Sequence, residues 1–155
     1  MRKITTCLIV LLCSFSVAQA QNYGRFEGEF IASWLPDGRS MRLEKPVRYF
    51  GPDDVRWDAP AGLVSDGASI PPFFWSVIGG PFSGPYRSAA IVHDHYCETR
   101  ERPWQEVHKA FYTASRAAGV PETQAQLMYF AVYRFGPRWP RNRSGDTSRI
   151  VFRPK

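Results

Sequence analysis

The sequence predicts an α+β fold, in which an N-terminal antiparallel β-sheet packs with a C-terminal three-helix unit. In the first half of the chain, apolar residues alternate with polar ones between turn signals. In the second half, apolar residues recur every three or four positions, as on one face of a helix. No internal repeat interrupts this order. Strand-rich and helical segments are therefore expected to form one domain.

The predicted sheet contains a β-hairpin and one or two further strands. Residues 25–35 alternate loosely, Pro36-Asp37-Gly38 is a turn signal, and residues 41–50 return with apolar side chains at every second position. After a second break at residues 51–54, apolar residues on both sides of Pro60 indicate the remaining strand or strands.

Three helices are predicted over residues 85–99, 103–119 and 121–136. Proline is well tolerated in a first helical turn, and a proline stands at or beside the start of each segment. Glycine, which favours a left-handed stop, stands at the end of the second and third. Because the connections are short, we expect sequential helices to pack antiparallel.

The first 20 residues have the layout of a secretory signal peptide. Arg2 and Lys3 precede an apolar run over residues 7–17, and Ala18-Gln19-Ala20 supplies small residues for cleavage. We expect export to the periplasm or the extracellular space, a single domain over residues 21–139, and no transmembrane span after cleavage. Of the cysteines, only Cys97 would remain, which excludes an internal disulfide in the mature monomer that we expect.

Residues 140–155 are expected to form a basic C-terminal tail. The formal charge of +6 falls to +4 without Arg2 and Lys3, and the segment from Pro137 onward carries six basic residues against one acidic residue. Such a tail favours solubility and nonspecific attraction to anionic surfaces. Aromatic and basic residues do not interleave as in a nucleic-acid interface, so no specific nucleic acid is expected as a partner.

Two histidines lie in the apolar stripes of neighbouring predicted helices. If these helices are antiparallel, His93 and His108 are about equally far from the connecting turn and should face each other. An imidazole can act as a general base near neutral pH when a partner fixes its orientation. Asp94, Asp66 and Ser69 are the candidate partners, and these five residues form the candidate catalytic site.

The same histidines admit two other interpretations. His93 and Cys97 are one helical turn apart, so His108 could complete a set of three metal ligands, although the sequence identifies no metal or cofactor. Alternatively, both histidines are core residues that hydrogen-bond to nearby groups. Free cysteine is usually a small buried hydrophobe, so Cys97 can equally be a core residue.

A series of motifs resembles the domain-of-unknown-function family 1353, which is associated with phages and prophages. They are Ser65 to Pro71, Phe73-Phe74-Trp75, the His93-Asp94 pair, Leu127-Met128-Tyr129 and Phe135-Gly136-Pro137. The resemblance covers residues 26–139. It implies an Asp-x-Ala-Ser-x-Pro turn that contains Asp66 and Ser69, and a His-Asp pair, but no established activity. Where its members carry an aspartate on the following helix, this chain has His108.

Two functions fit these observations. One is an exported hydrolase that acts on an envelope component, peptidoglycan or lipid, through His93, Asp94, His108, Asp66 and Ser69. The other is a noncatalytic module, derived from a phage or binding the envelope, in which the same residues form a structural polar cluster. An open pocket beside the histidines favours the first, and a sealed polar cluster favours the second.

Overall fold

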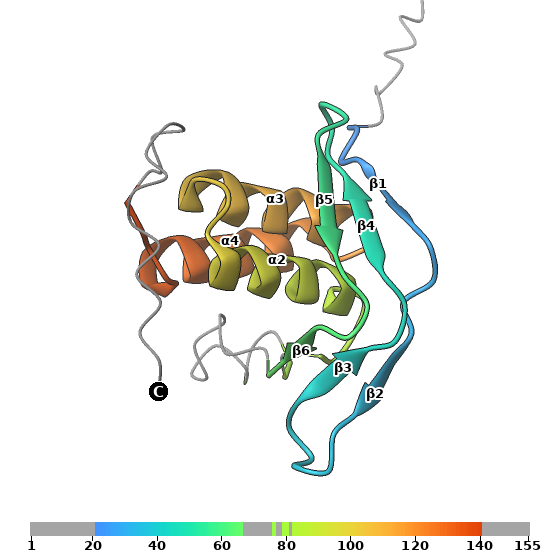
Figure 1. The fold of residues 1–155 in the computed structure, drawn as a ribbon. Coiled ribbons are helices and arrows are strands. Elements are labelled where there is room, and N and C mark those ends of the chain that lie inside the picture. Colours follow the sequence, from blue (N-terminus) through green and yellow to red (C-terminus); the bar gives the residue numbers. More distant parts are fainter. Residues whose placement is uncertain (1–20, 67–75, 77–78, 81, 141–155) are drawn as a thin grey trace, which may run out of the picture.

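A computed structural model of the chain describes residues 21–66, 76, 79–80 and 82–140. Strands occupy the N-terminal half and helices the C-terminal half, which confirms the α+β prediction (Figure 1). The expected signal peptide, Ser69, the segment 73–75 and the tail beyond Pro140 lie outside the described residues. None of the helices in the described part combines the length and the apolar content that a bilayer crossing needs.

Six short strands make up the β layer of the described chain. They are β1 (Arg25–Glu27), β2 (Ala32–Trp34), β3 (Met41–Leu43), β4 (Val47–Phe50), β5 (Arg56–Ala59) and β6 (Val64–Ser65). They form two antiparallel sheets, ordered β1-β4-β5 and β2-β3-β6. Figure 1 shows the first of these sheets beside the helices and the second below it. The single predicted sheet is therefore divided.

The two sheets nevertheless share one pairing register. Arg25 lies opposite Phe50 in the first sheet and Ala32 opposite Leu43 in the second, so both pairs belong to one long hairpin. β5 pairs with β4 in the first sheet and β6 pairs with β3 in the second. These two pairings also share one register. The predicted hairpin is thus confirmed, with its ladder interrupted in the middle.

Two prolines explain this interruption. Val47 pairs with Ala59, so the next position of the same register places Pro46 opposite Pro60. Neither residue has an N–H to donate, and the ladder cannot continue through that level. Beyond it, Leu43 resumes the pairing by donating its N–H to the Leu63 carbonyl. The chain consequently bends between the sheets.

Helices α2 (Arg87–Thr99), α3 (Trp104–Ala117) and α4 (Glu122–Phe135) agree with the three predicted segments. The predicted stripe of α2 is buried against the first sheet, where Tyr96 packs edge-on against Trp57 at 4.9 Å between ring centroids. Apolar side chains of α3 and α4 complete the core, among them Val107, Phe111 and Met128. Packing against the sheet and α3 thus fixes α2.

Candidate functional site

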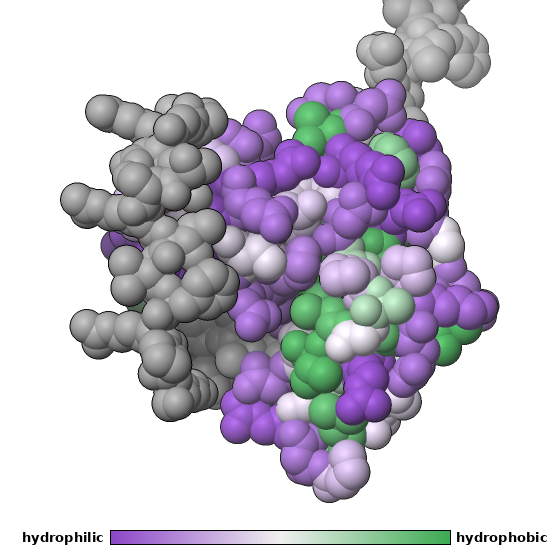
Figure 2. Space-filling model, viewed as in Figure 1, coloured by the Kyte–Doolittle hydropathy of each residue, from purple (hydrophilic) through white to green (hydrophobic). Residues whose placement is uncertain are grey.

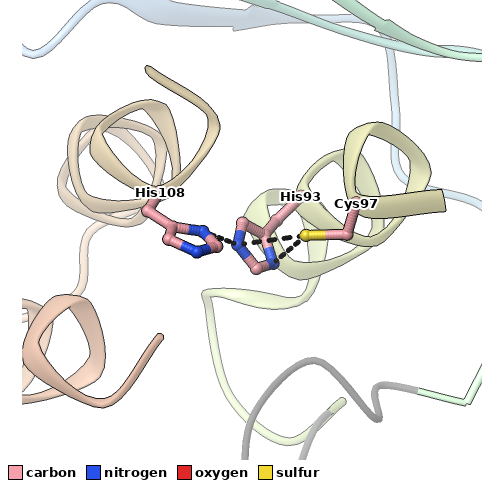
Figure 3. A group of neighbouring side chains, drawn as sticks. All are labelled: His93, Cys97 and His108. Carbon is pink, nitrogen blue, oxygen red and sulfur yellow. Dashed lines mark hydrogen bonds between the residues drawn. The ribbon is translucent and has the colours of Figure 1, made fainter. Parts of the chain in front are cut away.

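The two histidines meet at the centre of the helical layer. His93 comes from α2 and His108 from α3, and their rings point toward each other (Figure 3). His93 Nε2 lies 2.9 Å from His108 Nδ1, and the two residues are only 2% and 0% exposed. The predicted proximity of these residues is therefore confirmed, because the short connection folds α3 back along α2.

The other ring nitrogen of His108 determines the direction of this hydrogen bond. His108 Nε2 lies 3.2 Å from the backbone carbonyl oxygen of Pro137. A carbonyl can only accept, so Nε2 carries the proton. In the neutral ring Nδ1 then has a lone pair, and His93 Nε2–H donates to it. The tautomer of His108 and the proton on His93 Nε2 follow from the position of one backbone carbonyl.

Opposite shifts of pKa separate the two rings. Burial lowers the pKa of His108 to about 3, and the positive charge of His93 and Arg138 contributes, although the Pro137 carbonyl opposes it. Burial also disfavours the charged form of His93, but the sulfur of Cys97 and the carboxylate of Asp94 outweigh burial and raise the pKa of His93 to about 9. A proton taken up by the pair therefore resides on His93, the ring nearer to Asp94.

Asp94 and Cys97 surround the far side of the His93 ring. Asp94 Oδ1 is 3.8 Å from His93 Nδ1, and Asp94 Oδ2 accepts a hydrogen bond from the Ser65 hydroxyl at the end of β6. Cys97 Sγ lies 3.6 Å from His93 Nε2 and 3.8 Å from Nδ1, so the sulfur sits beside the ring (Figure 3). A continuous polar chain therefore links Ser65 to His108.

A cleft of about 450 Å³ opens at the outer end of this chain. Asp94 and Cys97 lie in its wall, whereas His93 is behind them. Three of the lining residues are acidic, and one of these, Asp66, also forms an ion pair with Arg39 at 3.3 Å. Among the residues that the structure describes, the lining consists of Ser40, Leu63, Val64, Ser65, Asp66, Asp94, Cys97 and Glu98.

The surface around the β2-β3-β6 sheet has both hydrophobic and hydrophilic parts. In Figure 2, hydrophobic residues gather over β3, β6 and the segment that leads to β6, and the surface around them is mostly hydrophilic. Val64 of β6 is 44% exposed and lies in the cleft wall. The cleft thus offers an apolar edge beside its carboxylates, which suits a ligand that has both polar and apolar parts.

The sequence prediction found part of this arrangement. Asp66 and Asp94 share the cleft, and His93 and His108 share a hydrogen bond, whereas Ser69 lies outside the described residues. Ser65 and the Pro137 carbonyl were missed as partners. No local pattern identifies either, because Ser65 meets Asp94 only when β6 packs near α2.

Comparisons with known proteins give the chain its relatives. A profile of the family described as "Protein of unknown function (DUF1353)" matches residues 41–132. Two proteins of Sinorhizobium fredii (strain NBRC 101917 / NGR234) are similar to this chain. "Uncharacterized protein y4jT" is 41% identical over 137 residues, which cover 83% of this chain and 40% of that protein. "Uncharacterized protein y4iH" is 38% identical over 115 residues, which cover 74% of this chain and 48% of that protein. The chain spans less than half the length of these relatives. No solved structure matches it significantly.

Proposed function

Since the chain belongs to the DUF1353 family, whose description assigns no function, we propose a function from the geometry of its cleft: hydrolysis of a component of the bacterial envelope. The observation that carries the proposal is a carboxylate, Asp94, that lies in the wall of an open cleft and is backed by a buried pair of imidazoles. An acid–base group that is both accessible and firmly held is what a hydrolytic site needs.

Asp94 is the proposed catalytic residue. Its side chain is 14% exposed, so it can contact water in the cleft, while the Ser65 hydroxyl donates to one of its oxygens and His93 Nδ1 lies 3.8 Å from the other. As general base, Asp94 takes a proton from water, and the resulting hydroxide adds to the electrophilic atom of the substrate. The leaving group departs with the proton that Asp94 returns. The base is regenerated and one water molecule is consumed.

His93 and His108 are positioning residues in this scheme. His93 does not line the cleft, but it lies against Asp94 and is itself held by His108. The sequence led us to expect His93 as the base. We now propose Asp94 for that role because it is the member of the pair that reaches the cleft.

The substrate class follows from two features. Export, which we propose from residues 1–20, would bring the protein to peptidoglycan and lipid, in the periplasm or outside the cell. The cleft wall combines carboxylates with the apolar side chains of Leu63 and Val64, and both envelope components present polar groups beside apolar ones.

The test compares the purified protein with its Asp94→Asn variant on isolated peptidoglycan and on phospholipid vesicles, with release of soluble fragments or fatty acid as the readout. Loss of a general base should reduce turnover by about 10²- to 10⁴-fold. Glu101→Gln makes the same chemical change at an exposed position in the α2–α3 connection and should leave turnover unchanged.

Two results would overturn the proposal. One is equal turnover by the wild type and Asp94→Asn, and the other is no turnover by the wild type on either substrate. Binding of the protein to peptidoglycan or vesicles without turnover would instead support a noncatalytic envelope-binding module.

A further inference from the structure

We propose that His93, His108 and Cys97 form a binding site for a divalent transition metal such as Zn²⁺. These side chains are the ligand types that Zn²⁺ prefers, two imidazole nitrogens and a thiolate sulfur. All three residues are buried, and their ligand atoms lie within 4.8 Å of one another. The metal site does not depend on the hydrolase proposal, because a metal can bind there whether or not the cleft is catalytic.

Two of the three ligand–ligand distances can be compared with those of a zinc site, and all three are within 4.8 Å. Tetrahedral Zn²⁺ with the usual bond lengths separates two nitrogens by roughly 3.4 Å and a nitrogen from a sulfur by roughly 3.6 Å. In this structure Cys97 Sγ is 3.6 Å from His93 Nε2, and His93 Nε2 is 2.9 Å from His108 Nδ1. The two nitrogens would therefore need to separate by about 0.5 Å, which small side-chain rotations can supply.

The groups behind the histidines strengthen the argument. A histidine that binds a metal usually donates its other ring N–H to a carboxylate or a backbone carbonyl, which fixes the ring. His108 Nε2 faces the Pro137 carbonyl oxygen at 3.2 Å, and His93 Nδ1 faces Asp94 Oδ1 at 3.8 Å. Asp94 is held in turn by Ser65. His93 Nε2 and His108 Nδ1, which face each other, are therefore the nitrogens that a metal would use.

The cleft supplies access to a fourth ligand. Three protein ligands with one open position are typical of catalytic zinc, whereas structural zinc usually has four protein ligands. Cys97 lies both beside His93 and in the cleft wall. A water molecule would thus reach the metal from the cleft, on the side where Asp94 also lies.

Cobalt and zinc binding by the full chain provide the test. After treatment with EDTA, the protein is titrated with Co²⁺ and followed by absorbance, and Zn²⁺ affinity is then measured by competition. We expect one equivalent of Co²⁺, a thiolate-to-cobalt charge-transfer band and intense visible bands of a four-coordinate ion. Zn²⁺ should displace it and abolish the spectrum.

Variants assign the ligands. Cys97→Ser should remove the charge-transfer band and weaken Zn²⁺ binding at least about 100-fold, because a hydroxyl is a poor ligand for this metal. Asp94→Asn, which changes only the group behind His93, should weaken binding about 10- to 100-fold. His95→Ala is the matched control, because the His95 ring packs on Tyr96 and is not in the cluster.

A variant that does not fold is recognised by circular dichroism in EDTA. If Cys97→Ser does not fold, Asp94→Asn, at a partly exposed position, tests the metal site through the group behind His93. Binding of well below one equivalent, a cobalt spectrum without the sulfur band, or unchanged affinity in both Cys97→Ser and Asp94→Asn would overturn the metal site. Metal binding without turnover would support the metal site and overturn the hydrolase proposal. Full turnover in EDTA by protein that binds no metal would support the hydrolase proposal and overturn the metal site.

Discussion

The hydrogen bond between His93 and His108 can be measured in a double-mutant cycle of leucine substitutions. His93→Leu removes the N–H that His108 Nδ1 accepts, and His108→Leu removes the acceptor of the His93 N–H. Each single change leaves a polar atom buried without its partner, since both residues are at most 2% exposed. Such an atom costs about 1–3 kcal/mol, and leucine has a volume similar to that of histidine.

The double variant removes both partners together. Hydrogen bonds to charged groups contribute about 1.5–3 kcal/mol, so the double variant should lose less stability than the sum of the single variants by about that amount. With a urea m-value of about 2 kcal/mol per molar, a coupling of this size moves the midpoint by about 1 M, well above the error of the measurement.

The assay is urea unfolding at pH 7, followed by tryptophan fluorescence in the presence of EDTA. The chelator keeps metal out, so that the cycle reports the hydrogen bond alone. A second cycle of His95→Leu with His108→Leu serves as control, because the His95 ring packs on Tyr96 instead. Additive losses in the His93 cycle, to within about 0.5 kcal/mol, would refute the shared hydrogen bond.

Two further predictions concern the β layer. Gly24→Ala should destabilise the protein by more than about 2 kcal/mol in thermal unfolding, because φ of Gly24 is +87° and a Cβ would lie 2.0 Å from the Phe50 carbonyl oxygen. Gly38→Ala is the control. Gly38 has φ +65° with open space around it, so this change should cost only about 1 kcal/mol. Tyr49 provides a pH test: burial raises its pKa to about 12 from 10.0. Because the folded protein keeps the phenol proton at higher pH than the unfolded chain, this contribution is complete below pH 10 and is lost as the pH rises toward 12. Tyr49→Phe should flatten the fall in unfolding free energy over that range, and an unchanged slope would contradict the assignment.

The elements of the fold could be predicted because local patterns decide them. Alternating residues gave the hairpin, and apolar stripes gave the three helices. The division of the sheet could not be read in the same way, because it depends on which residue lies opposite which. Pro46 and Pro60 are 14 positions apart in the sequence, and only the register of β4 with β5 places them at one level.

The same limit applies to the site. The contact of His93 with His108 follows from a short connection between two helices, so the sequence was enough. The cleft wall combines β6 with the last turns of α2, and nothing local in either segment identifies the other. Cys97 shows this most clearly: it is as buried as the sequence predicted, yet it also lies in the cleft wall next to His93.

The polarity of the histidine pair needs a reason other than stability. Val107, Phe111 and Ala114 of α3 line a small cavity together with His93, and an apolar pair of similar volume would fit there without buried polar atoms. A shared proton and a metal ion are the two occupants that imidazoles in this position can hold, and they exclude each other because both require the lone pair of His108 Nδ1. In the hydrolase that we propose, the proton-linked state holds Asp94 in place. In the metal-bound state the same aspartate orients a ligand. Unfolding in EDTA measures the hydrogen-bonded state in the absence of metal, and cobalt titration measures whether a metal ion displaces the proton.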